Sequence, residues 1–239
     1  MSVVVPAYNE EGRIGESLRK IRDYMLGRGL EFEIVVADDG SDDRTPEIVR
    51  GAAGEDPRIV LARTERNQGK GAAVRGGVRA SKGDVVLFSD ADLSTPIEEF
   101  ENLLPWLDEN PLVIASRSLP DSDVVVRQPF YREMMGRAFN VFVRLLVVRG
   151  LIDTQCGFKM MTRRAADEIF RRQRLNSFSF DVEVILIAKR LGFAVKEVPV
   201  RWINSRASKV HPIVDSIEML LDLMRVKFYD ISGCYKRSD

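Results

Sequence analysis

The stretch Asp84-Val-Val-Leu-Phe-Ser-Asp-Ala-Asp-Leu-Ser-Thr-Pro96 places two carboxylates directly after a run of apolar residues. The run from Val85 to Phe88 predicts a buried strand, and Asp90 and Asp92 follow at its end. Residues i and i+2 of an extended chain point to the same side, so these carboxylates repel each other unless a cation lies between them. Mg²⁺ and Mn²⁺ prefer oxygen ligands and share them with substrate phosphates. The alternative is a polar turn in which Asp92 or Ser94 caps the next helix.

The composition limits the kinds of protein to consider. The chain has 239 residues, 45% of them hydrophobic, with 36 basic and 36 acidic side chains. This is enough for a sizeable core, and the absence of a basic excess argues against a nucleic-acid partner. Two cysteines are too few for a disulfide framework, and a zinc site or a Ser-His-Asp triad would have to use the only histidine, His211. We expect no signal peptide and no transmembrane helix.

Strand and helix patterns alternate along the first half of the chain. We expect strands at residues 2–6, 32–37, 59–61, 85–88 and 112–115. Helices are expected at residues 14–25 and 97–108. A further helix should start with Thr45 as N-cap and Pro46 at its first helical position, and another should follow Gly71 and end at Ala80. This alternation predicts a parallel α/β sheet with helices on both faces.

Ligands bind such sheets at the carboxyl ends of the strands, and four polar clusters fall there. They are Tyr8-Asn9-Glu10, Asp38-Asp39, the segment from Asn67 to Gly71, and Asp90-Ala91-Asp92. The glycine signature of dinucleotide folds is absent, and Gly69-Lys70-Gly71 lacks the remaining residues of a phosphate-binding P-loop. Phosphate binding at this edge would therefore depend on a metal ion and on Lys or Arg.

The second half of the chain is different. The segment from Arg117 to Arg149 is locally basic, and the apolar helix expected at residues 130–148 could be core or could lie in a membrane interface. Asp153-Thr-Gln-Cys-Gly-Phe-Lys159 is a dense polar cluster that leads into a short strand. A helix from Phe178 to Leu191 carries Asp181, and a strand is expected at residues 194–200.

An amphipathic helix is expected from Pro212 to Tyr229. Its apolar face comprises Ile213, Ile217, Leu220, Leu221, Met224 and Phe228. Its polar stripe comprises Asp215, Glu218, Asp222 and Arg225.

Several of these motifs together resemble the family 2 glycosyltransferases of the GT-A fold. They are Val4-Val-Pro-Ala-Tyr-Asn-Glu10, Val36-Ala-Asp-Asp-Gly-Ser41 and Asp90-Ala-Asp92. Further motifs are similar to the dolichyl-phosphate β-glucosyltransferase branch, close to the dolichol-phosphate mannose synthases: residues 89–96, Ala115-Ser-Arg-Ser-Leu119, Arg127-Gln-Pro-Phe-Tyr-Arg132 and residues 153–159. The resemblance implies one GT-A domain over residues 1–239. Its nucleotide-sugar half would be residues 1–116, its acceptor half residues 117–210, and its C-terminal helix residues 211–239.

The resemblance also implies the substrates and the residues that bind them. The donor would be a nucleotide sugar, with UDP-glucose favoured over GDP-mannose, and the acceptor a polyisoprenyl phosphate. The enzyme would be cytoplasmic and peripheral at the cytosolic membrane face. The nucleotide sugar would be bound by Pro6, Tyr8, Asn9, Glu10, Asp38, Asp39, Lys70, Asp90, Ala91, Arg206 and Lys209. Mg²⁺ or Mn²⁺ would be held by Asp90, Asp92 and Ser94. The acceptor phosphate would be bound by Arg117, Arg132 and Arg137.

The expected mechanism needs positive charge more than it needs a base. Asp92, Arg117, Arg132 and Lys209 are the residues expected to be catalytic. A phosphate monoester has a second pKa of about 6, so the acceptor is largely ionised at neutral pH and already nucleophilic. Asp181, the base position of hydroxyl-using relatives, is therefore expected to be a structural or positioning residue. Single in-line displacement would invert the sugar's linkage from α to β. Ser94 departs from the mannose synthases, which have Gln at that position, so the third protein ligand to the metal is in question.

Other interpretations of these residues remain open. Asp38 and Asp39 suit a turn, Arg117 and Lys70 suit a surface, and Cys156 suits a packing position. The whole chain could instead be a transferase that uses a hydroxyl acceptor, a nucleotidyltransferase, or a nucleotide-sugar-binding module without catalysis.

Overall fold

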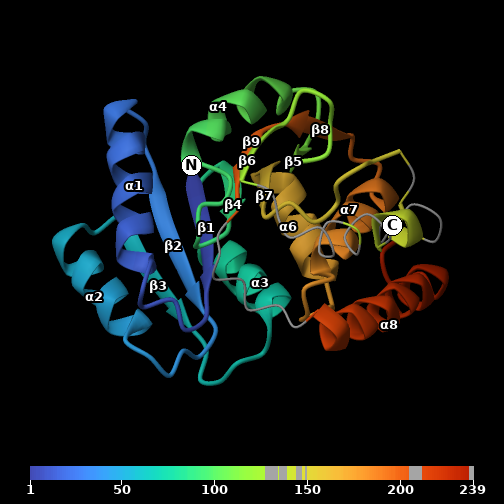
Figure 1. The fold of residues 1–239 in the computed structure, drawn as a ribbon, viewed down its shortest axis with the longest axis horizontal. Coiled ribbons are helices and arrows are strands. Elements are labelled where there is room, and N and C mark those ends of the chain that lie inside the picture. The colour runs from blue at the N-terminus through green and yellow to red at the C-terminus, as the bar shows by residue number, and fades with distance from the viewer. Residues whose placement is uncertain (127–133, 135–138, 144–146, 149, 205–211, 237–239) are drawn as a thin grey trace.

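The computed structural model describes residues 1–126, 134, 139–143, 147–148, 150–204 and 212–236, with the backbone alone at 212–217. Its core is a seven-stranded sheet of order β3-β2-β1-β4-β7-β5-β8 (Figure 1). The strands are β1 (Ser2–Ala7), β2 (Glu33–Asp38), β3 (Ile59–Arg63), β4 (Val85–Ser89), β5 (Leu112–Ser116), β7 (Phe158–Thr162) and β8 (Val195–Pro199). All pairs are parallel except those of β7, which is antiparallel to both β4 and β5.

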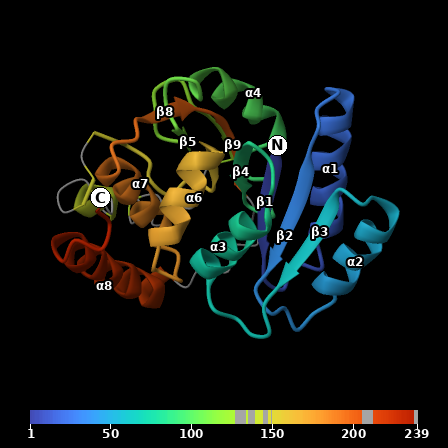
Figure 2. The ribbon, with the colours of Figure 1, turned by 180° about the vertical axis from the view of Figure 1, so that it is seen from behind.

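Alternate strand residues face two separate cores, as the two-residue repeat of a strand requires. Val3 and Val5 pack with α1 (Ile14–Gly27), while Val4 packs on the other face with α3 (Lys70–Ala80). Helices α6 (Arg163–Arg172) and α7 (Phe180–Arg190) cover the same face as α3, and Figure 2 shows this side of the molecule. Because both faces are buried, the strands have the continuous apolar runs from which they were predicted.

The predicted parallel strands are confirmed, but three other features of the fold were not predicted. We expected neither helix α6, nor the antiparallel direction of β7, nor the small parallel sheet of β6 (Asp123–Val126) and β9 (Arg201–Ile203). The helix expected at residues 97–108 is divided into η1 (Ile97–Glu99), α4 (Phe100–Leu103) and η2 (Leu104–Trp106). Pro105, within this stretch, has no N–H to donate to a continuous helix.

The predicted N-cap at Thr45 is wrong by one residue. Helix α2 (Thr45–Glu55) includes Thr45, and Arg44 is its N-cap without a side-chain hydrogen bond. The Thr45 hydroxyl instead accepts the backbone N–H of Glu10 at 2.7 Å. This threonine therefore ties the loop after β1 to the start of α2.

The apolar segment at residues 130–148 lies largely outside the described residues. Residues 139–143 are helical, and Phe139 and Val143 are buried in the core that also contains α7. Met134 and Phe142 are exposed. The described part thus packs into the core on one side and presents apolar side chains on the other.

The C-terminal helix α8 (Pro212–Ile231) lies beside α6 and α7 on the outside of the molecule (Figures 1 and 2). Leu223 and Val226 are buried against the core. The predicted apolar face points outward, since Met224 is 61% and Phe228 is 66% exposed. Asp222, expected on the polar stripe, is buried, where it bonds the Ser177 hydroxyl and pairs with Arg225 at 2.9 Å. Among the described residues, every helix is too short or too polar to cross a bilayer.

A buried hydrogen-bond cluster fixes the segment that follows α8. The Tyr235 hydroxyl donates to Glu183 of α7 at 2.7 Å. The Glu183 carboxylate also accepts the backbone N–H groups of Arg174 at 2.9 Å and Leu175 at 2.8 Å. Burial raises the pKa of Glu183, and these donors oppose the increase. The carboxylate thus joins the segment after α8 to α7 and to the loop that precedes α7.

We expect Tyr235→Phe to lower the free energy of unfolding by about 1 kcal/mol, because it removes one buried hydrogen bond and keeps the ring. Chemical denaturation monitored by circular dichroism measures the difference. Tyr229→Phe is the control, since Tyr229 is half-buried beside Tyr235. Equal stability of the Tyr235→Phe variant and the parent would contradict the assigned hydrogen bond.

Candidate active site

The polar loops that follow β1, β2 and β4 meet at one edge of the sheet. β1 is hydrogen-bonded to both β2 and β4 in parallel, so the carboxyl ends of these strands are adjacent. Pro6 is paired with Ala37 near the end of β1. The candidate donor-binding residues predicted from this part of the sequence therefore lie together, as expected for a parallel sheet.

The loop after β1 is held by the loop after β2. Asn9 adopts a positive φ of 54°, donates its backbone N–H to the Ser41 hydroxyl at 2.9 Å, and accepts the N–H of Asp42 at 2.9 Å. Glu10 forms an ion pair with Arg13 at 2.6 Å. Tyr8 lies half-buried between Ala7 and Asn9. The predicted segment Tyr8-Asn9-Glu10 is thus an ordered part of this edge.

Asp38 and Asp39 are buried and have different partners. Asp38 bonds the hydroxyl of Ser41 and pairs with Arg63 at 3.1 Å, so the predicted turn chemistry is present at this position. Asp39 accepts the N–H groups of Gln68 at 2.9 Å and Gly69 at 2.7 Å. Asp39 therefore connects the β2 loop to the loop that precedes α3.

Lys70 lies opposite Asp90. Its ammonium group pairs with the Asp90 carboxylate at 2.7 Å and lies 5.4 Å from the centre of the Phe88 ring. Burial lowers the pKa of Lys70, but Asp90 and Asp181 raise it by more, so the net shift is upward. The preceding Gly69 has φ of 103°, and a side chain there would meet the carbonyl oxygen of Asn176 at 2.3 Å. Lys70 is therefore a cation fixed inside the site rather than a surface residue.

Asp92 lies in a tight turn after β4. Its carboxylate accepts the N–H of Ser94 at 2.9 Å and is 3.9 Å from Arg13, and Leu93 between them has φ of 47°. Asp92 and Ser94 do not cap a helix, because η1 begins after Pro96 without a side-chain cap. The backbone of Ala91 is fixed as well, since its carbonyl accepts the hydroxyl of Ser17 at 2.6 Å.

Asp90 and Asp92 lie in a turn rather than in the extended chain expected from the sequence, and their role as metal ligands stays a prediction. Both carboxylates are partly exposed, with 34% and 27% of the side chain accessible. The described part of the chain has no group of three or more His, Cys, Asp or Glu side chains that could hold a metal. Mg²⁺ is usually bound by one or two carboxylates together with substrate phosphates. Ser94 uses its backbone N–H for Asp92 and its carbonyl for Ile203, and its hydroxyl as a metal ligand stays a prediction.

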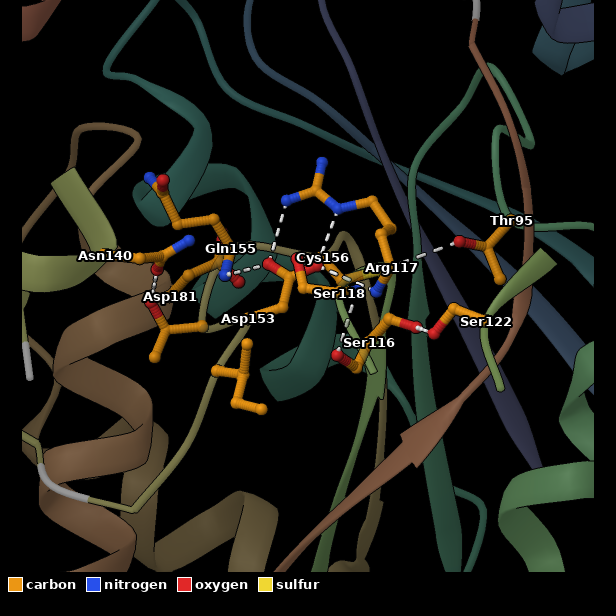
Figure 3. Close-up of polar contacts among 12 residues, drawn as sticks. Thr95, Ser116, Arg117, Ser118, Ser122, Asn140, Asp153, Gln155, Cys156 and Asp181 are labelled. Carbon is orange, nitrogen blue, oxygen red and sulfur yellow. Dashed lines mark hydrogen bonds and ion pairs between the residues drawn. The ribbon is translucent and has the colours of Figure 1, made fainter. Parts of the chain in front are cut away.

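Arg117 follows β5 and is held by Asp153 (Figure 3). Its side chain donates two hydrogen bonds to the two carboxylate oxygens, at 2.7 and 2.8 Å, and its backbone N–H adds a third at 2.9 Å. Burial opposes charge on both groups, but each partner's charge outweighs it, so the pKa of Arg117 is raised and that of Asp153 is lowered. The guanidinium group also lies 5.4 Å from the Trp202 ring centre. With 26% of its side chain exposed, Arg117 is a fixed cation that can still contact an anion.

The residues that hold Arg117 were not assigned a role from the sequence. Asp153 is fully buried, and the Glu197 carboxylate accepts its backbone N–H at 2.7 Å and that of Ile152 at 2.9 Å. The dense polar cluster from Asp153 to Lys159 was the available signal. Its pairing with Arg117 could not be deduced, because it depends on contacts 36 residues apart.

Asp181 is buried in α7 and pairs with Lys159, which is itself 1% exposed. Burial raises the pKa of Asp181, and the ammonium groups of Lys159 and Lys70 oppose that increase. Cys156 is also buried, and burial raises the pKa of its thiol to about 11, as expected for a packing residue. Arg132, Arg137, Arg206 and Lys209 lie outside the described residues, as does His211.

Comparisons with known proteins extend these observations. Residues 2–170 match the model of the family described as glycosyl transferase family 2. The dolichyl-phosphate beta-glucosyltransferase of Dictyostelium discoideum is 36% identical over 249 residues, which cover 99% of this chain and 76% of that protein. The protein of the same name from Mus musculus is 32% identical, with 99% and 77% covered.

Solved structures of low identity share the fold. Glucosyl-3-phosphoglycerate synthase from Mycobacterium tuberculosis, solved with Mn²⁺, UDP and phosphoglyceric acid, superimposes with a TM-score of 0.68 at 22% identity. The match covers 100% of this chain and 79% of that one. Mannosyl-3-phosphoglycerate synthase from Rubrobacter xylanophilus gives 0.71 at 19% identity, with 97% and 74% covered. The family match spans more than half of the chain and agrees with the full-length relatives. The chain therefore belongs to glycosyl transferase family 2 and is a glycosyltransferase of the GT-A fold.

Proposed function

We propose that the protein transfers glucose from UDP-glucose to a polyisoprenyl phosphate of the dolichyl type at the cytosolic face of a membrane. The relatives that match 99% of this chain are named dolichyl-phosphate beta-glucosyltransferases, which supports glucose as the sugar and dolichyl phosphate as the acceptor. The observation that carries the proposal is a fixed guanidinium group, Arg117, at the same sheet edge as the acidic pair Asp90 and Asp92. An anionic acceptor needs a cation of this kind, whereas a hydroxyl acceptor does not.

The donor half would bind the nucleotide diphosphate. Asp90 and Asp92 would hold Mg²⁺ or Mn²⁺, which supplies positive charge to the diphosphate as it leaves. Lys70 is already placed beside Asp90, and its ammonium group would add positive charge at the same position. The loops that carry Tyr8 and Asp39 would bind the nucleoside.

The acceptor half would hold the lipid phosphate against the donor's charge. Arg117 keeps its orientation because Asp153 accepts hydrogen bonds from its Nε and Nη2 atoms. The other N–H groups of the guanidinium group would then bind the phosphate. The fork geometry of arginine suits phosphate oxygens, and its charge reduces the repulsion between acceptor and donor. Arg132 and Arg137 are proposed to assist.

No protein base is required for this reaction, and Asp181 is poorly placed to be one. The acceptor phosphate is largely ionised at neutral pH. Asp181 is 3% exposed and its carboxylate is bonded to Lys159. A base must come within hydrogen-bond reach of the proton that it removes. A single displacement by the phosphate oxygen would then invert the configuration at the sugar carbon.

The outer face of α8 supports contact with a lipid surface. Leu220, Met224 and Phe228 recur every four residues and are 42%, 61% and 66% exposed. Ile231 extends the row at 74% exposure, and Arg225 is exposed beside it. A row of exposed apolar side chains on one face of a surface helix is typical of helices that lie in a membrane interface.

The central experiment is transfer from labelled UDP-glucose or GDP-mannose to polyprenyl phosphate, with Mn²⁺ or with EDTA. We expect a glucosyl lipid with UDP-glucose and Mn²⁺, and its loss with EDTA. Product from GDP-mannose alone would replace glucose by mannose in the proposal. Transfer to a hydroxyl acceptor without lipid would contradict it.

We expect Asp92→Asn to lower kcat/KM for transfer by roughly 100-fold or more, because a metal site contributes several kcal/mol to such reactions. Circular dichroism should show an intact fold, since an amide oxygen can still accept the N–H of Ser94. Asp108→Asn, at an exposed acid, is the control. Turnover equal to that of the parent would refute the assignment of Asp92 to the metal.

We expect Arg117→Lys to raise the KM of the lipid phosphate by roughly tenfold while the KM of UDP-glucose changes less, because lysine keeps the charge but loses the fork. Arg117→Ala should follow the same pattern but also destabilise the fold, since it leaves Asp153 buried and unpaired. Steady-state kinetics with each substrate varied in turn measures the split. Arg201→Lys, at an exposed arginine of β9, is the control. A larger effect on the donor KM would remove Arg117 from the acceptor site.

We expect Met224→Gln with Phe228→Gln to weaken binding to phosphatidylcholine–phosphatidylglycerol vesicles by at least about tenfold, because two large apolar side chains no longer enter the interface. Co-sedimentation measures the bound fraction. Leu26→Gln with Val60→Gln, at exposed apolar residues away from α8, is the matched control. Unchanged vesicle binding would show that this face of α8 does not contact lipid.

A further inference from the structure

The turn from Asp153 to Gly157 lies between the two halves of the proposed site. At its start, Asp153 holds Arg117. At its end, the carbonyl oxygen of Gly157 accepts the backbone N–H of Asp90 at 3.0 Å. Gly157 is also packed against the Asp90 side chain, because an added Cβ would come within 1.9 Å of a carboxylate oxygen. A displacement of this turn would therefore move Asp90 and Arg117 relative to each other.

The buried ammonium group of Lys159 also holds this turn in place. Lys159 is 1% exposed, and its ammonium group donates to the carbonyl oxygen of Cys156 at 2.6 Å. The same group pairs with Asp181 of α7 and lies 5.9 Å from the centre of the Phe88 ring. Lys159 thus connects the residue before Gly157 to the rigid helix α7.

The position of Lys159 in the sheet makes this connection stiff. Lys159 is paired with Phe88 of β4 on one side and with Ile114 of β5 on the other. Its backbone is therefore fixed by two strands, and only the orientation of its ammonium group depends on Asp181. An ammonium group buried this deeply is retained only with such partners.

We propose that Lys159 is a positioning residue for transfer: it fixes the Asp153–Gly157 turn and thereby fixes the position of Asp90 relative to Arg117. Asp181 is its counter-ion. The proposal rests on the proposed function, because it assumes that Asp90 contributes to a metal site and Arg117 to an acceptor site.

The alternative is that Lys159 and Asp181 only stabilise the fold, and three variants separate the possibilities. Lys159→Met alone leaves Asp181 buried without a counter-ion, which is strongly destabilising. Lys159→Met with Asp181→Asn removes both charges and should recover most of the stability. It does not restore the hydrogen bond to Cys156, so the position of the turn should remain disturbed. Lys159→Arg keeps the charge with a different shape and should rescue the function in part.

The experiment measures Mn²⁺ binding to the full chain in the presence of UDP by titration calorimetry, together with the thermal midpoint and transfer kinetics. We expect the double variant to fold and to bind Mn²⁺ roughly 10- to 100-fold more weakly, the range found for residues that orient metal ligands. The KM for the lipid phosphate should rise as well. Met160→Ala is the control, since Met160 is the buried neighbour of Lys159 on β7. It should lower the thermal midpoint without changing Mn²⁺ affinity.

Two outcomes would overturn the inference, and they differ in what else they affect. A folded double variant with the Mn²⁺ affinity and lipid KM of the parent would show that Lys159 is structural only and leave the proposed function intact. A parent protein that binds no Mn²⁺ with UDP would overturn the metal part of the proposed function and the inference with it.

Discussion

The site depends on the insertion of one antiparallel strand into an otherwise parallel sheet. β7 lies between β4, which carries Asp90 at its end, and β5, which leads to Arg117. Since β7 runs in the opposite direction, its beginning lies at the carboxyl ends of its two neighbours. The turn before β7 is therefore delivered to the same edge as Asp90 and Arg117. A parallel strand at this position would bring its end to that edge instead.

The electrostatics of the site follow from this arrangement. Three acids, Asp90, Asp153 and Asp181, are paired with Lys70, Arg117 and Lys159 in turn. Asp153 and Asp181 are almost fully buried. Replacing their ion-pair partners by water or substrate would therefore cost much free energy. The Asp90–Lys70 pair is more accessible, with 34% and 21% of the side chains exposed. It is thus the pair that the proposed diphosphate and cation would rearrange, while the other two hold the framework.

Much of the donor side could be predicted because it is local in sequence. Each parallel strand is a short apolar run, and the acids follow directly at its end, as at Asp39 and Asp90. The acceptor side depends on contacts between distant segments. Nothing near Lys159 in the sequence shows that it is buried opposite Asp181. The pattern of α8 predicted an apolar face but missed the buried Leu223 and Val226, and the amphipathic rule did not show that the predicted face is exposed and that Asp222 is buried. Hydrophobic periodicity identifies a stripe and not the neighbour that covers it.

The buried side of α8 is joined to the donor side through a short segment. Asp222 of α8 bonds the hydroxyl of Ser177, and the carbonyl oxygen of Asn176 accepts the N–H of Gly71 at 2.8 Å. Gly69 packs against the same carbonyl, so the start of α3, with Lys70, is fixed by the segment on which α8 also rests. A helix held only by apolar contacts could slide along its axis, whereas a buried carboxylate with a fixed partner sets its register. The apolar row of α8 therefore has a defined position relative to Lys70 on the donor side of the proposed site.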